Sequence, residues 1–408
     1  MTDQITVKPG STAEVVEALR RARQDDLAVT VVAGGHGPWA HAPSDGLRLD
    51  LSALTDIDVD GTTVRVGGGA TWGAVAARLS DEGLAISSGD TASVGVGGLT
   101  LGGGIGWMTR LWGLAADQLV GAQLVTADGE VVETSADEHP DLFWALRGGG
   151  GNFGVVIRFD FAAHRLPAIV HARYTGAGDP AALLRAMRDA MRNAPDALTV
   201  TYMDVPPMDP SAPAGASLVA VWAGDDEARM RAALAPVHEI DGVAAEITTP
   251  AYRDILAELP APADPDQPPP GFIGGNGLFA SLDDELIDRL VTFRAAYPVS
   301  VVFLRSLGGA YGAVAQDATA FPARDATWFV MAGGFDIPGM VDDDTRTAMD
   351  ADANSIQQGR LAEYGNFVPV EAPDRVPGMF DDAAYARLRE VKAQWDPRNT
   401  FRRNHNIV

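Results

Sequence analysis

The distribution of glycine constrains this chain more than any other feature of its sequence. Dense glycine clusters occupy residues 33–37, 67–73, 95–106 and 148–154, and they become rarer beyond residue 167. Seven of the twelve residues from 95 to 106 are glycine, a content that would weaken a helix or strand packed in a core. The apolar residues among them, such as Leu99 and Ile105, argue against an exposed flexible loop. We therefore expect this segment to cradle a ligand, because its backbone N–H groups can approach an anion or a flat ring without obstruction by side chains.

Charge and cysteine content exclude several classes of function. The chain has 408 residues, which predicts two or three domains of ordinary size. Its formal net charge of −24 would repel phosphate backbones and anionic lipid, so we expect no nucleic-acid and no membrane partner. The chain has no cysteine, which excludes disulfide bonds, thiolate nucleophiles, iron–sulfur clusters and cysteine-bound zinc. Because neither a signal peptide nor a long apolar stretch is found, we expect a soluble, cytoplasmic protein.

Hydrophobic periodicity predicts an α+β chain with a boundary near residue 166. In the first part, Ser11 and Glu14 form a capping box before a helix at 12–25, and Asp128-Gly129 joins a hairpin at 123–134. Further strands are predicted there at 29–32, 47–51, 62–66 and 154–161, and Thr71 caps a second helix. The middle part has predicted strands near 198–204, 217–223, 299–307 and 327–335, helices near 180–192, 226–237 and 283–296, and a proline-rich loop at 260–270. A last helix stops at Pro397, and an extended tail follows at 401–407.

Common nucleotide and metal motifs are not supported by their context. Residues 149–154 match G-x-G-x-x-G, but a β-like segment follows them, whereas a dinucleotide site needs a helix there. No G-x-x-x-x-G-K-[ST] loop exists, and the histidines show no metal-binding spacing. His36 stands between glycines after a predicted strand; a lone histidine of this kind is more often structural or solvated than functional.

Five blocks of sequence, taken in order, resemble the berberine-bridge-enzyme-like flavin oxidases of the vanillyl-alcohol-oxidase superfamily. The blocks are residues 33–37, 93–106 and 141–154, then 308–310 leading to 319–324, then 395–399 leading to 401–407. The resemblance implies a two-domain PCMH-type FAD-binding fold of the α+β class. It implies an FAD-binding domain at 1–166, an inserted antiparallel-sheet substrate domain at 167–370, and a C-terminal segment at 371–408 that completes the FAD-binding domain.

The resemblance also implies how FAD is held. His36 matches the histidine that is bonded to the flavin ring, and Thr91 stands where some members have a second, cysteinyl bond, so a single attachment is expected. Val32 and Ala323 replace an arginine and a histidine that many members have. The cofactor-binding residues expected from the matching blocks are Ala33, Gly34, Gly35, His36, Gly37, Gly89, Ser93, Val94, Gly95, Gly97, Gly98, Leu101, Gly103, Gly106, Asp117, Gly154, Val155, Asn366 and Asn404.

The implied activity is that of an FAD-linked oxidase. Such an enzyme removes a hydride from a small-molecule alcohol, amine or sugar-type substrate and passes the electrons to O2, giving H2O2. Secondary metabolism is one setting for this reaction. Val94 matches a position beside the flavin where a small residue leaves room for oxygen, which favours an oxidase over a dehydrogenase. A redox-neutral cyclase or isomerase, and a non-catalytic flavin-binding protein, remain the alternatives.

Tyrosines are the candidate catalytic bases. Tyr311 and Tyr364 lie in segments that the resemblance places near the flavin, although each could equally be an ordinary half-buried aromatic residue. A tyrosine base needs a partner that lowers its pKa, and Arg305 or Arg324 could serve Tyr311, whereas Asn366 is near Tyr364. Tyr202 and Trp222 could line the substrate pocket.

Overall fold

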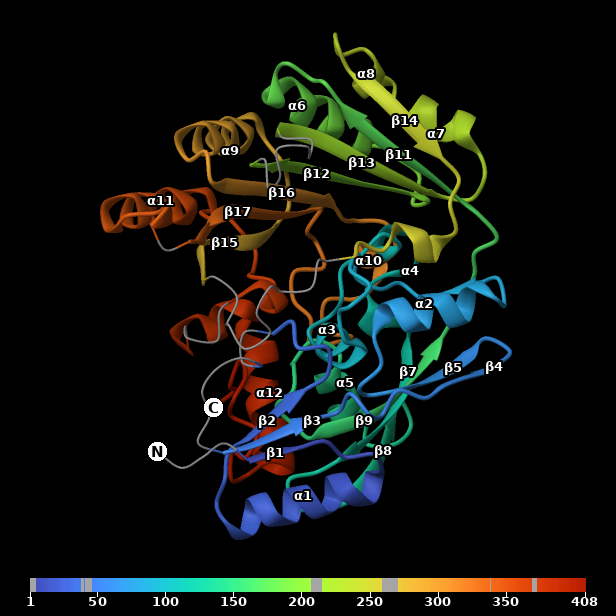
Figure 1. Ribbon diagram of the computed structural model, residues 1–408, viewed down its shortest axis with the longest axis vertical. Helices are drawn as coiled ribbons and strands as arrows, with labels where there is room; N and C mark the ends of the chain where they lie inside the picture. Colours follow the sequence, from blue (N-terminus) through green and yellow to red (C-terminus); the bar gives the residue numbers. More distant parts are fainter. Residues whose placement is uncertain are drawn as a thin grey trace.

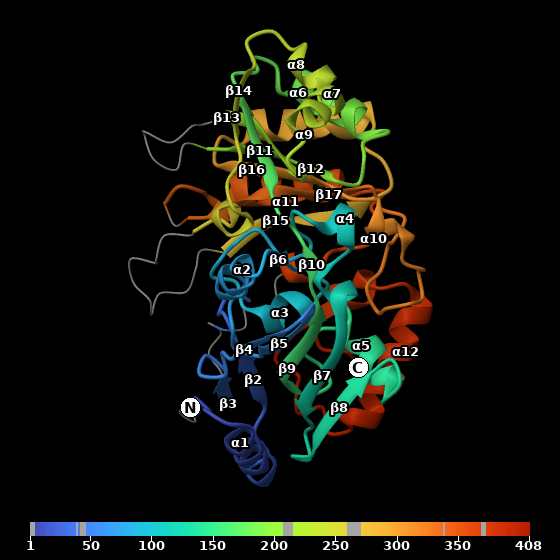
Figure 2. The same ribbon diagram turned by 90° about the vertical axis from the view of Figure 1, so that its right-hand side faces the viewer.

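A large and a smaller antiparallel sheet form the two halves of the molecule, and the short helix α3 (Val96–Leu101) of the glycine-rich segment 95–106 lies between the two sheets (Figures 1 and 2). The computed structural model describes residues 5–37, 40, 46–206, 215–258, 271–337, 339–368 and 373–408. The proline-rich loop predicted at 260–270 lies outside these ranges. Within them, the α+β architecture predicted from the sequence is confirmed.

The first half is built on a five-stranded antiparallel sheet and a three-stranded parallel sheet. The five strands, in sheet order, are β4 (Ile57–Asp60), β5 (Thr63–Gly67), β9 (Val155–Ala162), β7 (Leu119–Val125) and β8 (Val131–Ser135). The three parallel strands are β1 (Ile5–Val7), β3 (Leu47–Asp50) and β2 (Val29–Val32), and a short pair joins β6 (Leu84–Ala85) to β10 (His164–Arg165). The helices of this half are α1 (Thr12–Gln24), α2 (Trp72–Ser80), α3 (Val96–Leu101), α4 (Thr109–Trp112), η2 (Ala115–Gln118) and α5 (Pro140–Leu146).

The second half is a seven-stranded sheet in which every pairing is antiparallel. Its strands, in sheet order, are β14 (Ala244–Thr248), β11 (Ile169–Thr175), β13 (Gly215–Ala223), β12 (Leu198–Val205), β16 (Ser300–Ser306), β17 (Trp328–Asp336) and β15 (Gly271–Phe279). Helices cover its outer face (Figure 1), namely α6 (Pro180–Met191), α7 (Glu227–Ala233), α8 (Ala235–His238), α9 (Asp284–Ala296) and α11 (Asp343–Ile356). The short helices η3 (Tyr252–Ile255), α10 (Ala310–Ala313), η4 (Gly365–Phe367) and η5 (Pro373–Met379) belong to the connecting segments.

The C-terminal segment returns to the first half. Helix α12 (Asp382–Trp395) places Leu388 and Val391 in the same apolar core as α5. The buried Lys392 ammonium donates hydrogen bonds to the Asn152 and Phe401 carbonyls, and the Val29 N–H donates to the Thr400 carbonyl. This partition supports the predicted domain limits, which remain a prediction.

Most predicted elements are present, and the differences have local causes. The Ser11 hydroxyl caps α1 as predicted, but the Glu14 carboxylate accepts from the Gly10 N–H rather than closing the box on Ser11. The single helix predicted at 226–237 is divided into α7 and α8, with Pro236 in the first turn of α8. The glycine-rich segment at residues 95–106, called the glycine block from here on, contains one short helix, α3, whose Val96 and Leu101 are buried. Strands β11, β14 and β15 and helix α11 were not predicted.

Candidate cofactor and substrate site

The loop that follows β2 lies directly on the start of the glycine block. A Cβ on Gly34 would stand 2.2 Å from the Gly95 nitrogen, and a Cβ on Gly95 would stand 2.3 Å from the Gly34 nitrogen. The His36 Nε2 atom lies 3.0 Å from the Ser93 hydroxyl, and His36 is exposed. The structure therefore joins two of the predicted cofactor-binding motifs, backbone against backbone, with an imidazole at their meeting point.

Other glycines of the block are required by protein contacts. Gly103 has a φ of +113°, and a Cβ there would stand 2.4 Å from the Phe321 ring. A Cβ on Gly106 would stand 1.4 Å from the Ser88 carbonyl oxygen. Around exposed Gly98, in contrast, no atom of the described residues, apart from its neighbours along the chain, lies within 4 Å of a Cβ position. Gly98 is therefore the glycine of this block that leaves room for a ligand.

The remaining predicted cofactor residues divide in the same way. Gly35 has a φ of +76°, no atom of the described part of the chain beyond its two neighbours lies within 4 Å of its Cβ position, and Ser93 is exposed. A Cβ on Gly89 would clash with Leu99, and one on Gly154 would clash with Leu124. Four more of the predicted residues face the protein core or other backbone, namely Ala33, Gly97, Leu101 and Val155. Gly37 and Val94 are half-buried. The Leu101 carbonyl accepts the N–H groups of Gly148 and Gly150, which links two glycine clusters.

Tyr364 stands on the same block from the side of the second half. Its buried hydroxyl oxygen accepts hydrogen bonds from the Gly104 N–H (3.2 Å), the Ile105 N–H (3.3 Å) and the Asn366 amide (2.8 Å). The same Asn366 nitrogen donates to the Leu99 carbonyl, which fixes the orientation of the amide. Burial raises the pKa of the Tyr364 phenol, and the three N–H donors oppose that rise because they favour the ionised form. The predicted partnership of Tyr364 with Asn366 is confirmed.

Tyr311 is placed differently. Its hydroxyl donates a hydrogen bond of 2.7 Å to the Ala323 carbonyl, and the side chain is fully buried. Burial raises the pKa of the Tyr311 phenol, although the Arg324 guanidinium beside its ring lowers it in part. Because its hydroxyl already donates a hydrogen bond to a backbone carbonyl and its ring is buried, Tyr311 has the contacts of a structural residue rather than of a base.

Two ion pairs join the halves near the site; both side chains of the Arg324–Asp117 pair are buried, whereas the Asp90 side chain in the Arg305–Asp90 pair is 36% exposed. Asp117, a predicted cofactor residue, accepts both guanidinium nitrogens of Arg324 at 2.8 and 2.7 Å and also the Leu114 N–H. Arg305, a predicted partner of Tyr311, instead donates to the Asp90 carboxylate at 2.6 Å and to the Thr201 hydroxyl. Both carboxylate oxygens of Asp117 therefore accept hydrogen bonds from protein groups. These contacts are those of a residue that holds the fold together rather than of one that binds the cofactor directly.

Tyr202 and Trp222, predicted to line the substrate pocket, face the other side of the large sheet. Both are buried in the core that the sheet makes with its helices, together with Leu184 and Met187. That prediction is wrong because side chains alternate along a strand, and the residues turned toward the glycine block are the neighbours Thr201 and Met203. Sequence reasoning missed Phe303, Met331 and Phe367; the available signal was strand alternation for the first two and the position next to Asn366 for Phe367.

The C-terminal tail brings buried acceptors to the fourth glycine cluster, residues 148–154. The Asn404 amide nitrogen donates to the Gly151 carbonyl at 3.0 Å, and the Asn152 side chain bonds the backbone of His405 and Ile407. Within the described ranges, the buried Oδ1 atoms of Asn404 and Asn406 have no hydrogen-bond partner. A buried acceptor without a partner is costly, and a bound ligand with a donor group would satisfy it.

Comparison with known proteins decides the family. Residues 4–135 match the family described as "FAD binding domain", and residues 363–408 match "Berberine and berberine like". The (R)-6-hydroxynicotine oxidase of Paenarthrobacter nicotinovorans is 30% identical over 97% of this chain and 89% of its own length. The chain belongs to the berberine-bridge-enzyme-like family of FAD-linked oxidoreductases. The family resemblance inferred from the five sequence blocks is thereby confirmed.

Solved structures of this family share the whole architecture. The 6-hydroxy-D-nicotine oxidase of Arthrobacter nicotinovorans superposes with a TM-score of 0.81 at 26% identity, covering 99% of this chain and 91% of the other. A chitooligosaccharide oxidase gives a TM-score of 0.85 at 22% identity, covering 99% and 92% of the two chains. The predicted PCMH-type fold and FAD-dependent oxidoreductase activity are confirmed.

The residues present fit FAD as the family's cofactor. The cradle around Gly98 has room for a ligand, and the tail supplies the two buried acceptors of Asn404 and Asn406. Among the described residues, no group of three acidic or histidine side chains could hold a metal ion, and none of the helices is long and apolar enough to cross a membrane.

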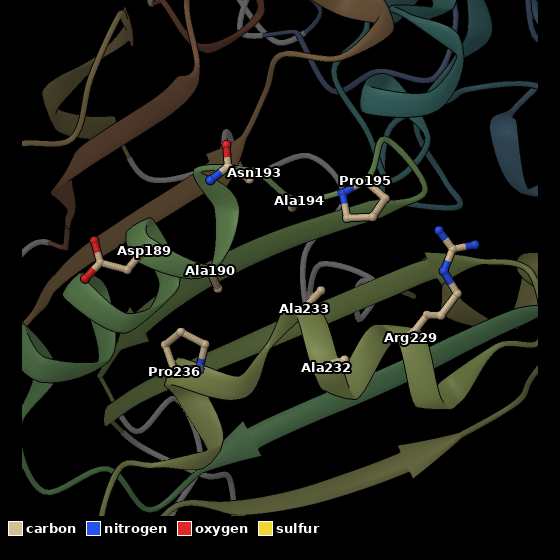
Figure 3. Close-up of a pocket in the computed structure, with 9 residues that line it drawn as sticks. All are labelled: Asp189, Ala190, Asn193, Ala194, Pro195, Arg229, Ala232, Ala233 and Pro236. Carbon is tan, nitrogen blue, oxygen red and sulfur yellow. The ribbon is translucent and has the colours of Figure 1, made fainter.

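A surface hollow of about 400 Å³ lies far from the candidate FAD site. Its lining comes from α6, the following turn, α7 and α8 (Figure 3), on the outer side of the large sheet. Alanine and proline make up most of that lining, so the hollow offers few groups for catalysis. The lining residues are Asp189, Ala190, Asn193, Ala194, Pro195, Arg229, Ala232, Ala233 and Pro236.

Proposed function

We propose that this protein is an oxidase that takes a hydride from a carbon of an alcohol, amine or sugar-type small molecule and passes the electrons to O2, giving H2O2. One observation carries the proposal: the Tyr364 hydroxyl from the second half rests on the Gly104 and Ile105 N–H groups of the glycine block. A titratable group therefore stands at the junction of the halves, beside the cradle that fits FAD. The (R)-6-hydroxynicotine oxidase and the chitooligosaccharide oxidase named above support the same reaction class.

In this proposal His36 holds FAD by a single covalent bond. The imidazole is exposed at the tip of the loop that lies on the glycine block, with Ser93 beside it. Because the chain has no cysteine, a second, thioether bond cannot form. Bound FAD supplies the acceptance of the hydride and the delivery of electrons to O2.

Tyr364 would take the proton that leaves the substrate's O–H or N–H group. Its oxygen is held by the two backbone N–H groups and by the Asn366 amide, so it does not need to reorient during the reaction. Only the ionised phenol can act as a base, and the same three donors favour the ionised form. Val94, a small half-buried residue of the block, supports the use of O2 by leaving space beside the cofactor.

The covalent bond is tested by mass spectrometry of the acid-precipitated protein. We expect the peptide that contains His36 to carry the flavin mass and the precipitate to stay yellow. His36→Ala should remove the adduct, whereas His238→Ala, which changes an exposed histidine on α8, should retain it. A colourless precipitate from yellow wild-type protein would show that the attachment is not covalent.

The oxidase reaction is tested by mixing the yellow protein with candidate substrates without oxygen. Bleaching of the flavin followed by H2O2 on admission of air is the expected result. Turnover without bleaching would favour the redox-neutral alternative, and bleaching that air does not reverse would favour a dehydrogenase. The absence of both reactions would favour a non-catalytic flavin-binding protein.

A further inference from the structure

We infer that the substrate of this site is apolar and at least partly aromatic, rather than a sugar; this inference rests on the proposed function. It is carried by four side chains, Met203, Phe303, Met331 and Phe367, which we call the apolar wall. The first three lie on the face of the large sheet that is turned away from its helices, and Phe367 lies in η4 next to Asn366.

Three members of the apolar wall form one continuous row across neighbouring strands. Met203 of β12 pairs with Phe303 of β16, and Phe303 pairs with Met331 of β17. Residues directly opposite each other in antiparallel strands have Cβ atoms about 5 Å apart, so these three side chains are direct neighbours on one face of the sheet. All three are only half-buried, whereas Leu304 and Val330 on the opposite face are fully buried beneath the helices. The row is therefore an apolar surface that the fold leaves partly uncovered.

The apolar wall continues to the candidate base. The Phe303 and Phe329 rings lie 5.9 Å apart, and the Phe329 ring lies 5.3 Å from Phe367 and 5.6 Å from Tyr364. Phe367 is 49% exposed although its ring lies beside the Phe329 and Tyr364 rings. A substrate lying against the wall would thus meet aromatic rings next to Tyr364, and rings pack well in offset or edge-to-face arrangements.

The polar side chains beside this row are already bonded within the fold. The Asn276 amide donates to the Phe367 carbonyl and accepts the Tyr364 N–H, and the Ser217 hydroxyl donates to the Met203 carbonyl. In the next row, Arg305 engages Asp90 and Thr201, and its guanidinium stacks 4.5 Å from the Trp107 ring. Among the described residues of the row that contains Met203, the half-buried side chains of Met203, Phe303 and Met331 have no N–H or O–H group, and the half-buried Ser217 hydroxyl is engaged by the Met203 carbonyl.

This distribution separates two classes of substrate. A sugar exchanges many hydrogen bonds with water for bonds with its site, and groups that remain unpaired are costly. An apolar or aromatic molecule needs contact area, which phenylalanine supplies and which the flexible methionine side chain can adjust. The apolar wall offers the second kind of contact.

Binding to the yellow holoenzyme tests the inference independently of turnover. The probes are benzyl alcohols with a 4-methyl, 4-ethyl or 4-propyl group, and glucose and cellobiose as matched sugars, measured by calorimetry and by the change in flavin absorbance. We expect the dissociation constant to fall about fourfold for each added methylene, the ratio that corresponds to ~0.8 kcal/mol per buried methylene. We expect no saturable binding of either sugar.

Substitutions in the apolar wall locate the effect. Met331→Gln and Phe303→Gln should weaken binding of the aromatic series by about tenfold, whereas Phe303→Leu should retain most of it. Met340→Gln is the matched control, because Met340 is 62% exposed and lies outside the site. Retained flavin colour and thermal unfolding identify variants that fail to fold, and the Phe303→Leu and Met331→Gln pair then decides the comparison.

The outcomes distinguish this inference from the proposed function. Saturable sugar binding without a methylene dependence would overturn the apolar substrate, and so would binding of neither class. Sugar-driven bleaching would overturn it while leaving the oxidase intact. Binding of the aromatic series with the expected dependence, but without flavin reduction by any compound, would support the apolar wall and contradict the proposed oxidase reaction.

Discussion

At the scale of single residues, the two candidate tyrosines differ in what their hydroxyl groups do. The Tyr364 oxygen accepts hydrogen bonds from three N–H donors, whereas the Tyr311 hydroxyl donates a hydrogen bond to the Ala323 carbonyl. Donors stabilise the charged form that a base needs, and a backbone acceptor stabilises the neutral form. The residue that acts as a base is therefore expected to be Tyr364.

Replacing the two tyrosines by phenylalanine separates these roles. Tyr364→Phe should slow flavin reduction by ~10²–10⁴-fold, the range for the loss of a general base, with little change in substrate binding. Tyr311→Phe should keep the reduction rate and lower the free energy of unfolding by ~1–3 kcal/mol, because the Ala323 carbonyl then lacks a donor. Anaerobic rapid mixing and urea unfolding measure the two effects. Wild-type reduction rates in both variants would point instead to an acidic residue, with Asp90 the first to test.

The pKa of Tyr364 also predicts a pH dependence. Because burial raises this pKa above its ordinary value, only a small fraction of the phenol is ionised near neutral pH, and that fraction grows as the pH rises. The rate of flavin reduction should therefore increase with pH through the neutral and alkaline range. In Tyr364→Phe this increase should be lost. A wild-type rate that is flat from pH 6 to about 10 would contradict a tyrosine base.

At the scale of structural elements, glycine has two different functions in the block. Gly103 must be glycine for the fold, since its φ is +113° and the Phe321 ring is 2.4 Å from a Cβ position. Gly98 is in the middle of α3, where alanine would be the better helix former. A loss of flavin in a Gly103 variant would therefore report a disturbed fold, and Gly98 is the position that reports on the ligand cradle.

Substitution at these two positions should give opposite effects on stability. Gly103→Val should destabilise the protein by roughly 1–3 kcal/mol or more. Gly98→Ala should leave the flavin-free protein as stable as the wild type or stabilise it by ~0.5–1 kcal/mol, while lowering flavin occupancy. Thermal unfolding and the ratio of flavin to protein absorbance measure both quantities. Full flavin occupancy in Gly98→Ala would show that the cradle does not use this residue.

Some helices and strands could be predicted from the sequence, and others could not. The strands with clear alternation and the two helices capped by Ser11 and Thr71 were identified, and so were the motifs that meet at His36 and Ser93. Strand β15 was missed because glycines at 271, 274, 275 and 277 hide its pattern. The orientation of β12 was also missed, because Leu198–Tyr202 of this strand are buried on both faces, and the pattern of apolar residues then does not reveal which face holds Tyr202. Partners distant in sequence, such as Arg305 with Asp90, follow only from the assembled fold.

At the scale of the whole molecule, buried arginines of both halves hold the site together. Arg324 and Arg305 reach from the second half to Asp117 and Asp90 of the first. Arg110 reaches in the other direction and donates to the Leu198 and Leu307 carbonyls. Because Tyr364 and the glycine block belong to different halves, their contact depends on these connections. The cofactor cradle and the proposed base are therefore expected to lose their alignment together when a connection fails.

The Arg324–Asp117 pair offers the sharpest test of this coupling, since both side chains are at most 8% exposed. Arg324→Met leaves the Asp117 carboxylate buried without its partner, which should destabilise the protein by ~3–5 kcal/mol and lower flavin occupancy. Adding Asp117→Leu removes that charge, so the double variant should regain most of the stability. Urea unfolding followed by both tryptophan and flavin fluorescence measures the coupling, and the two signals should change together in the wild type. A double variant no more stable than Arg324→Met would show that the loss arises from packing around Arg324 and not from the uncompensated carboxylate.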